Sequence, residues 1–352
     1  MSVPPGSTIG ILGGGQLGRM LAIAAANLGY RTHIYAPGPS GPASEVAARW
    51  THAGFDDDAA LAAFSAQVDV VTYEFENVGV SALRKIPGVR PGVHALEVAQ
   101  DRLSEKRFAE QLGGRPAPFR PVDSLDDLVA ALAEIGAPAI LKTRRFGYDG
   151  KGQVRITDPA LAHEAWARIG EKPAVLEAFV PFEVEFSILL VRGIDGEVLL
   201  WDAPTNRHRD GILDISTVPA TGIVLRQAQE AAALATRIAT ELNYVGVLTC
   251  EFFAGPTGPV FNEMAPRVHN SGHWTIEGAV TSQFENHIRA ICGIPLGATG
   301  LIGQRAEMRN LVGADAEEWH GILTDPAAHL HLYGKANARP GRKMGHVTRV
   351  WF

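Results

Sequence analysis

Leu248-Thr249-Cys250-Glu251-Phe252-Phe253-Ala254-Gly255-Pro256-Thr257-Gly258-Pro259-Val260-Phe261-Asn262-Glu263 contains two apolar runs separated by a turn of glycine, proline and threonine. Two apolar runs on either side of such a turn are typical of a β-hairpin. We expect Gly258 to take the left-handed position of a three-residue loop, with Gly255 facing Pro259. In that register Glu251 faces Glu263.

The two facing glutamates suggest a cation site. Like charges directly opposite one another on a sheet repel, so the hairpin loses stability unless something cationic lies between them. Glu251, Glu263 and the amide oxygen of the adjacent Asn262 are hard ligands of the kind that Mg²⁺ takes, usually beside substrate phosphates. A solvated hairpin whose acids diverge at a bulge explains the pattern about as well. The hairpin alone leaves both interpretations open.

The hairpin leads into Met264-Ala265-Pro266-Arg267-Val268-His269-Asn270-Ser271-Gly272-His273-Trp274, which is dense in functional groups. Its apolar residues follow neither a period of 2 nor one of 3.6, which indicates a strand end and loop rather than a packing element. His269 and His273 have the i, i+4 spacing of metal ligands on a helix. Pro266 and Gly272 make a helix improbable, so the spacing does not indicate a zinc site.

Composition narrows the class of protein. The chain has 352 residues, of which 46% are hydrophobic and 20% charged, enough for two or three globular domains. A net charge of −6 argues against a nucleic-acid-binding surface. The only cysteines are Cys250 and Cys292, which favours a reducing cytosol. The N-terminus lacks the basic start of a secretory signal, and no apolar run reaches the ~20 residues that span a bilayer. We therefore expect a cytoplasmic protein without membrane segments.

The first hundred residues alternate strand and helix patterns, which predicts a parallel sheet with right-handed crossovers. Residues 8–12, 31–35 and 68–73 are predicted strands, and residues 19–28 a helix. Gly13-x-Gly15-x-x-Gly18 lies between the first strand and that helix, as in dinucleotide-binding proteins. Such proteins carry an acid at the end of the second strand, where this chain has Tyr35-Ala36-Pro37-Gly38, so NAD binding is disfavoured. The turn still offers N–H groups to an anion or a polar substrate.

A glycine-rich loop follows the predicted strand 139–143. Lys142 ends this strand, and residues 144–153 then combine three glycines with several cations, which suits a lid over phosphates. The order of residues is not that of a P-loop. We predict an N-terminal domain over residues 1–112, a small lid domain over residues 113–180, and a larger α+β domain over residues 181–352.

A basic segment lies near the C-terminus. Lys335, Arg339, Arg342 and Lys343 fall within nine residues of a net-acidic chain. Alone, such a run is more often a solvated edge than a phosphate clamp.

Together these parts resemble the ATP-grasp ligases. Gly13-Gly14-Gly15-Gln16-Leu17-Gly18-Arg19-Met20, Gly147-Tyr148-Asp149-Gly150-Lys151-Gly152-Gln153, residues 262–274 and Arg339-Pro340-Gly341-Arg342-Lys343 closely resemble the N5-carboxyaminoimidazole ribonucleotide synthetases within that group. The resemblance covers residues 9–347 and implies an ATP-grasp fold, α/β and α+β, with a Rossmann-like pre-ATP-grasp domain in front. The family commonly continues past residues 345–346 with a further helix, whereas this chain ends at Phe352.

The resemblance also implies roles for individual residues. Lys142 and Arg102 would hold the ATP phosphates under the lid, backbone groups of the strand at 177–180 would bind adenine, Glu185 the ribose, and His208 would lie beside the nucleotide. The implied ATP-binding set is Arg102, Lys142, Gly147, Tyr148, Asp149, Gly150, Lys151, Gly152, Gln153, Glu177, Ala178, Phe179, Val180, Glu185, His208, Asn262 and Glu263. Glu251 and Glu263 would carry Mg²⁺, as the hairpin register also suggests.

The same resemblance implies a carboxylation site. Arg267, His269, Asn270 and Ser271 would face bicarbonate and its phosphorylated form. Aminoimidazole ribonucleotide would contact Gln16, Leu17 and Glu74, with its phosphate on Lys335, Arg342 and Lys343. Bicarbonate would attack the ATP γ-phosphate, and the resulting carboxyphosphate, or CO₂ released from it, would carboxylate the exocyclic amine. No general base is evident, and the released phosphate could serve.

Three other functions remain open from sequence. A formate-dependent glycinamide ribonucleotide transformylase has the same ATP-grasp parts, a nicotinamide dehydrogenase would use the glycine turn, and a nucleotide sensor would need no paired acids. The resemblance implies a homodimer.

Overall fold

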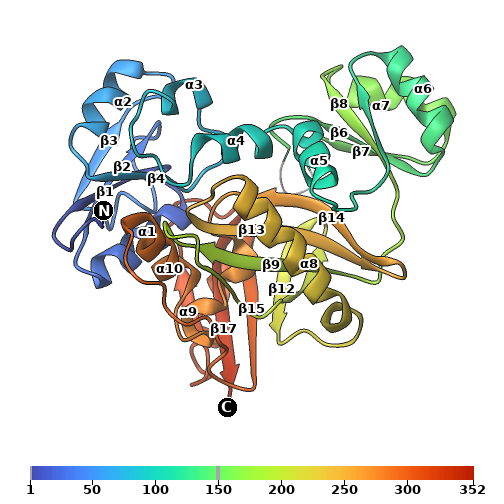
Figure 1. The fold of residues 1–352 in the computed structure, drawn as a ribbon. Coiled ribbons are helices and arrows are strands. Elements are labelled where there is room, and N and C mark those ends of the chain that lie inside the picture. The colour runs from blue at the N-terminus through green and yellow to red at the C-terminus, as the bar shows by residue number, and fades with distance from the viewer. Residues whose placement is uncertain (1, 148–150) are drawn as a thin grey trace.

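The structure, a computed structural model, describes residues 2–147 and 151–352, so Met1 and the predicted site residues Tyr148, Asp149 and Gly150 lie outside it. The fold contains three sheets (Figure 1). The N-terminal sheet is parallel throughout, as predicted, in the order β3-β2-β1-β4. Its elements are β1 (Thr8–Leu12), α1 (Gln16–Asn27), β2 (Arg31–Ala36), β3 (Arg49–His52), α2 (Asp58–Ser65), β4 (Val70–Tyr73), α3 (Val80–Leu83) and α4 (Val93–Ala99).

The second sheet is small and antiparallel, in the order β5-β8-β6-β7. α5 (Arg102–Gln111) leads to it, and its elements are β5 (Phe119–Val122), α6 (Leu125–Ile135), β6 (Ala139–Thr143), β7 (Gln153–Ile156), η1 (Pro159–Leu161), α7 (Ala162–Arg168) and β8 (Ala174–Ala178). Its helices and strands share a hydrophobic core of their own, with Leu132, Leu141, Trp166 and Leu176 among its members. This unit stands apart at one end of the molecule (Figure 1).

The large sheet has nine strands, in the order β14-β13-β9-β11-β12-β15-β17-β16, with β10 beside β9. Its strands are β9 (Val184–Arg192), β10 (Val198–Leu200), β11 (Thr205–Arg209), β12 (Ile212–Val218), β13 (Gly246–Gly255), β14 (Gly258–Ala265), β15 (Arg305–Val312), β16 (His329–Leu332) and β17 (Lys343–Trp351). The accompanying helices are α8 (Gly222–Glu241), η2 (Asn270–Gly272), α9 (Thr275–Gly278), α10 (Gln283–Cys292), η3 (Gly313–Glu318) and α11 (Trp319–Ile322).

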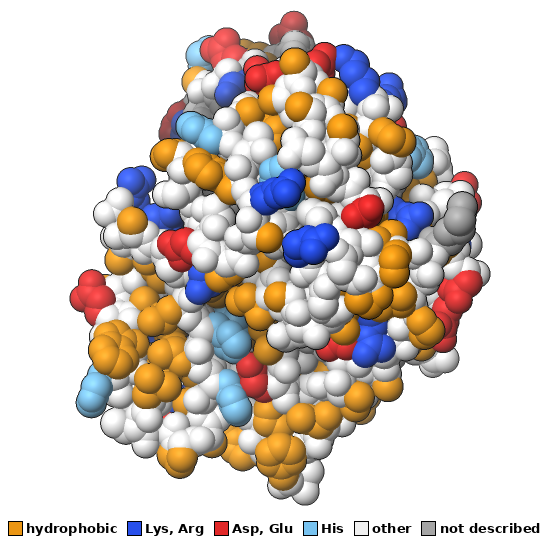
Figure 2. Space-filling model, turned by 90° about the vertical axis from the view of Figure 1, so that its left-hand side faces the viewer, with side chains coloured by type: hydrophobic (Ala, Val, Ile, Leu, Met, Phe, Trp, Pro, Cys, Tyr) orange, Lys and Arg blue, Asp and Glu red, His pale blue; other side chains and the backbone are white. Residues whose placement is uncertain are grey.

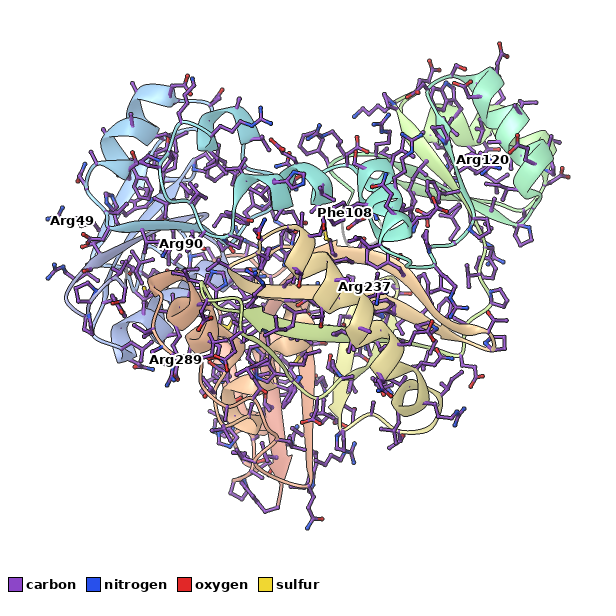
Figure 3. The ribbon with its side chains drawn as sticks, viewed as in Figure 1. Arg49, Arg90, Phe108, Arg120, Arg237 and Arg289 are labelled. Carbon is purple, nitrogen blue, oxygen red and sulfur yellow. The ribbon has the colours of Figure 1, made fainter. Side chains whose placement is uncertain are left out.

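One hydrophobic core joins the N-terminal sheet to the large sheet. It contains Ile11 and Leu21 from the first hundred residues together with Val247 and Ile288 from the large unit. Arg90, labelled in Figure 3, reinforces the junction by donating to the carbonyl of Ile291 at 2.6 Å. The predicted domain limits at residues 112 and 180 remain predictions.

The hairpin register is confirmed at the acids and wrong at the turn. Glu251 pairs with Glu263, as predicted, but Gly255 pairs with Gly258 across a two-residue loop instead of with Pro259. A bulge between Glu251 and Phe252 shifts the register by one residue and restores the predicted pairing of the acids. Gly258 does have a positive φ, of 115°. Because directly opposed residues point to the same face of a sheet, both carboxylates lie on one side.

No basic face is evident from the side drawn in Figure 2, where Lys and Arg side chains are interspersed with acidic and apolar ones. Among the described residues, no helix is both long and apolar enough to cross a membrane.

Candidate active site

The paired acids each have a cationic or imidazole partner. The guanidinium of Arg102, in the first turn of α5, donates to Glu263 Oε2 at 2.8 Å. His269 Nε2 lies 2.9 Å from Glu251 Oε1. Burial alone would raise the pKa of Glu263, but the adjacent Arg102 charge lowers it to about 2. Glu263 is therefore ionised at neutral pH.

The donor set on this hairpin fits a hard cation. Glu251 and Glu263 supply carboxylate oxygens, and Asn262 Oδ1 is buried without a hydrogen-bond partner among the described residues. An unpaired buried amide oxygen is costly unless a ligand completes it. Carboxylate and amide oxygens are the ligands that Mg²⁺ prefers.

A buried cluster of charges joins α5 to the small sheet. Lys142 and Lys106 both place Nζ against the same oxygen of Glu177, Oε2, at 3.0 and 3.1 Å. Lys106 also donates to the carbonyl of Asn262 at 3.3 Å, which links the small sheet to β14. Although burial raises the pKa of Glu177, the two lysines lower it below its ordinary value, so the carboxylate stays charged.

Sequence reasoning missed two members of this cluster, Glu105 and Lys106. They are almost completely buried, and Glu105 Oε1 accepts from the N–H of Met264 at 2.6 Å. Arg102, Glu105 and Lys106 lie at i, i+3 and i+4, so they share one face of α5. That charged face was the available signal, but on a helix surface it ordinarily indicates solvent exposure.

The burial of Glu105 gives a pH prediction. Burial, with the nearby Glu263 charge, raises the pKa of Glu105 from 4.5 to about 8. The stabilisation from its tighter proton is complete below the unfolded pKa and is lost as the pH rises through the folded one. Between about pH 5 and about pH 8, the unfolding free energy of wild type should therefore fall faster than that of Glu105→Gln, by up to about 1.4 kcal/mol per pH unit.

Urea denaturation across that range measures the difference, with Glu110→Gln on the exposed face of α5 as the control. Parallel pH profiles for wild type and Glu105→Gln would show that Glu105 is already ionised in the folded protein.

The loop predicted to be a lid is held by hydrogen bonds at both of its described ends. The carbonyl of Gly147 faces Arg102 Nη2 at 3.5 Å, and the carbonyl of Gly152 accepts from the N–H of Thr143 at 2.8 Å. Gly152 has a φ of +72°, and a Cβ there would lie 2.6 Å from Thr143 Oγ1. Gln153 is the first residue of β7 and pairs with Lys142. Lys151 is exposed.

The strand predicted at 177–180 ends at Ala178, the last residue of β8, and the segment already uses part of its backbone. The N–H groups of Ala178 and Phe179 donate to the carbonyls of Pro118 and Pro138. In the part of the chain that the structure describes, Val180 N–H has no recorded partner, and Glu177 Oε1 is a buried acceptor without one. These two groups could serve a heterocycle that offers one acceptor and one amino group.

Glu185 and His208 form a pair next to the acids. Glu185 Oε1 lies 3.2 Å from His208 Nδ1, and one ligand atom of each lies within 4.8 Å of one of Glu251. Burial lowers the pKa of His208, but the adjacent Glu185 carboxylate outweighs it and raises the pKa above its ordinary value.

Arg267 is held rigidly beside the acids. Its Nε and Nη2 both contact Glu76 Oε2, at 2.8 and 2.7 Å, and Nη1 donates to the carbonyl of Val268 at 3.1 Å. Glu76 was not predicted as a site residue, although it follows a predicted strand. Two contacts fix the plane of the guanidinium, which a lysine could not reproduce.

The loop that carries His269 and Ser271 is part of a buried polar network. His269 Nδ1 lies 2.8 Å from Ser271 Oγ, which lies 2.9 Å from Ser187 Oγ. The side-chain amide of Gln283 binds both the N–H and the carbonyl of His269, at 2.9 and 2.7 Å. Gln283, which sequence reasoning also missed, therefore fixes the backbone at the start of η2.

Two backbone N–H groups of the glycine turn are already hydrogen-bonded to a side chain of the protein. The N–H groups of Gly15 and Gly18 donate to the two oxygens of Glu74, at 2.8 and 3.3 Å. The expectation that these N–H groups are free for an anion is therefore wrong, because a buried carboxylate already takes them. The same contact removes the dinucleotide interpretation, since a pyrophosphate would compete with Glu74 for the turn. Burial raises the pKa of Glu74.

Three of the predicted substrate residues, Gln16, Leu17 and Glu74, lie at this turn. Gln16 begins α1 and is partly exposed, whereas the Leu17 side chain is in the core, which leaves only its backbone for a ligand. The charge of Lys335 acts to lower the pKa of Glu74, and that of Lys343 acts to lower the pKa of His208. The basic segment thus extends from the glycine turn toward the paired acids.

The basic segment also has internal contacts. Lys335 Nζ donates to the carbonyl of Lys343 at 2.6 Å, and Arg342 donates to the carbonyl of Asn337 at 2.9 Å.

His269 and His273 flank a 3₁₀ turn rather than lying on an α-helix, and His273 is fully buried. Glu277, His331 and His346 do bring three potential ligand atoms within 4.8 Å. The rings of His331 and His346 stack at 4.5 Å with an interplanar angle of 8°, so their lone pairs lie in parallel planes and cannot converge on one ion.

Family comparisons agree with this geometry. An ATP-grasp domain model matches residues 107–284, a ribonucleotide synthetase pre-ATP-grasp domain model matches residues 6–100, and a phosphoribosylaminoimidazole carboxylase C-terminal domain model matches residues 306–351. The fold and the site therefore define an ATP-grasp ligase.

Individual relatives narrow the class. A Brucella melitensis N5-carboxyaminoimidazole ribonucleotide synthase is 51% identical, over 99% of this chain and 98% of its own. The chain belongs to the N5-carboxyaminoimidazole ribonucleotide synthase family. A crystal structure of such a synthetase with ADP has a TM-score of 0.95 and 41% identity, covering 99% of this chain and 93% of that one. An Aspergillus clavatus synthase in complex with ADP and 5-aminoimidazole ribonucleotide has a TM-score of 0.90 and 30% identity, covering 98% and 93%.

Proposed function

We propose that this chain uses ATP and bicarbonate to carboxylate 5-aminoimidazole ribonucleotide, giving N5-carboxyaminoimidazole ribonucleotide, ADP and phosphate in de novo purine synthesis. The main observation behind the proposal is a series of contacts. It joins the residues proposed to bind ATP to the glycine turn proposed to bind the ribonucleotide. His269 contacts Glu251 in the ATP region, and Arg267, two residues earlier, contacts Glu76 beside the glycine turn that Glu74 occupies. The family membership of the chain supports it.

ATP would lie between the small sheet and the hairpin. Val180 N–H and Glu177 Oε1 suit the acceptor and amino edges of adenine, and Glu185 suits the ribose hydroxyls. Lys142 and Arg102 would hold the phosphates under the lid formed by residues 147–153. Glu251, Glu263 and Asn262 would bind Mg²⁺, which would neutralise charge on the phosphates.

The carboxyl chemistry would take place in two steps. A bicarbonate oxygen attacks the γ-phosphorus of ATP and displaces ADP, which gives carboxyphosphate, while Lys142 and Arg267 stabilise the developing charge. The amine of the ribonucleotide then attacks the carboxyl carbon of carboxyphosphate and displaces phosphate. Alternatively, carboxyphosphate first splits into CO₂ and phosphate, and the amine adds to the CO₂. Because carboxyphosphate hydrolyses readily, the lid has to exclude water. The departing phosphate can take the amine proton.

A coupled assay of ADP release tests the function. Turnover should require both bicarbonate and the imidazole ribonucleotide, and should not occur with formate and glycinamide ribonucleotide. Equal turnover without bicarbonate would refute the proposal, and turnover with formate would favour the transformylase.

The basic segment gives a separate prediction. Lys335→Ala and Arg342→Ala should each raise the KM for the imidazole ribonucleotide by roughly 10-fold or more, because each removes a charge-assisted contact to its phosphate. The KM for ATP should stay within about twofold, since the adenine and metal residues lie elsewhere. Lys85→Ala, an exposed lysine paired with Asp58, is the control. A parallel rise in the KM for ATP would show that the segment serves the nucleotide instead.

A homodimer and a cytoplasmic location complete the proposal, and sedimentation and cell fractionation would test them.

A further inference from the structure

A buried amide lies behind the proposed carboxylation site. Asn310, in β15, is fully buried, and none of the roles proposed above involves it. Its side chain makes three hydrogen bonds. Nδ2 donates to the carbonyl of Leu213 at 2.8 Å and to Asn270 Oδ1 at 2.6 Å, and Oδ1 accepts from Asn270 Nδ2 at 2.9 Å. The two asparagine side chains are thus joined by a reciprocal pair of hydrogen bonds.

The Leu213 carbonyl fixes the orientation of both amides. A backbone carbonyl can only accept, so the Asn310 atom facing it has to be the nitrogen. The pairing then requires Asn270 Oδ1 to face Asn310 Nδ2, and Asn270 Nδ2 to face Asn310 Oδ1. Leu213 pairs across the strands with His208, the residue proposed to lie beside the nucleotide. One backbone group near the nucleotide therefore determines how the Asn270 amide is turned.

Asn270 keeps part of its hydrogen-bonding capacity for a ligand. Its amide has two N–H groups and two oxygen lone pairs, and the pair with Asn310 uses one of each. The remaining N–H lies on a side chain that is partly exposed in the site. Gln283 fixes the neighbouring backbone at His269, so the side-chain rotamer and amide direction are what Asn310 controls.

We propose that Asn310 is a positioning residue that holds the Asn270 amide with one N–H directed at bicarbonate and at the carboxyphosphate formed from it. This inference rests on the proposed function. The Asn310 side chain touches no reactant itself, and its effect passes through Asn270. An N–H fixed in advance stabilises developing negative charge without reorganising during the reaction.

Two variants of Asn310 separate this role from a purely structural one. Asn310→Asp keeps the shape but places an oxygen against the Leu213 carbonyl and Asn270 Oδ1, which forces the Asn270 amide to turn or leave. Asn310→Ser is too short to hold Asn270, because it lacks the nitrogen that donates to both Leu213 and Asn270. In both variants kcat for bicarbonate-dependent ADP release should fall roughly 10- to 100-fold, while the KM for ATP stays within about twofold.

The matched control is Asn286→Asp. Asn286 is also a fully buried amide that binds one backbone position through both groups, with Nδ2 to the carbonyl of Gly297 at 2.9 Å and Oδ1 to its N–H at 2.8 Å. It lies on α10, outside the site residues. Its substitution should lower the melting temperature comparably and leave kcat unchanged.

A double-mutant cycle completes the test. In an Asn270→Ala background, Asn310→Ser should cause no further loss of kcat, because the side chain that it positions is gone. Wild-type kcat in folded Asn310→Ser, or an undiminished loss in the Asn270→Ala background, would overturn the inference. Failure of the proposed function is distinguishable, since wild type itself would then show no bicarbonate dependence.

Discussion

Replacing Glu263 by Gln should remove most ATP turnover while leaving the nucleotide bound. Glu263 is ionised, its pKa being lowered to about 2 beside Arg102, and it faces Glu251 across the hairpin. Gln keeps the shape but loses the charge that the proposed Mg²⁺ ligand needs. A metal contributes several kcal/mol of charge stabilisation to phosphoryl transfer, so kcat for ADP release should fall by about 10² to 10⁴.

Glu230→Gln is the matched control for this experiment. Glu230 accepts from Arg115 at 2.7 Å, close to the 2.8 Å between Arg102 and Glu263. The pair of Glu230 and Arg115, however, is exposed. Its loss should change the unfolding free energy by at most about 1 kcal/mol and leave kcat intact. Calorimetric titration with ATP would complete the comparison. If Glu263→Gln turned over ATP at the wild-type rate, the acids would not form the metal site.

Arg267→Lys should have the second large effect. The lysine keeps the positive charge but cannot contact Glu76 through two nitrogens and Val268 through a third. The charge would then move away from the place where a bicarbonate oxygen meets the γ-phosphate. We expect kcat for bicarbonate-dependent ADP release to fall about 10²-fold or more, with the KM for ATP nearly unchanged.

Arg289→Lys tests whether any loss is specific to the site. On α10, Arg289 contacts Glu285 through Nε and Nη2 in the same manner, at 2.9 and 2.5 Å. This control should retain full activity. A loss in Arg267→Lys that appears only in the KM for ATP would place Arg267 with the nucleotide and remove it from the carboxylation step.

The parallel sheet could be predicted from sequence because short-range patterns determine its strands and helices. Thr8–Leu12 and Ala139–Thr143 are strands with the predicted bounds. The pairing of Glu251 with Glu263 was predicted from a wrong turn, and it holds only because the bulge at Glu251 and Phe252 offsets the shorter loop. A bulge depends on local twist and packing, which no apolar pattern records.

Other parts of the site depend on tertiary contacts that sequence patterns do not carry. Glu74 and the glycine turn are 59 residues apart at Gly15, so nothing local shows that the carboxylate caps the turn. Lys106 and Glu105 lie on a charged face of α5, and such a face is ordinarily exposed to solvent. In this fold the small sheet and the hairpin bury it. Asn310 and Gln283 are uncharged and lie outside the motifs, and only their hydrogen bonds to residues 269 and 270 identify them.

The most direct measurement follows oxygen from bicarbonate into phosphate. With ¹⁸O-labelled bicarbonate, attack of a bicarbonate oxygen on the γ-phosphorus leaves one labelled oxygen in each phosphate released during the initial turnovers. Mass spectrometry should find that singly labelled phosphate, and only when ADP is formed in the presence of bicarbonate. Unlabelled phosphate would mean that water attacks ATP, and the site would not be a carboxyphosphate-forming one.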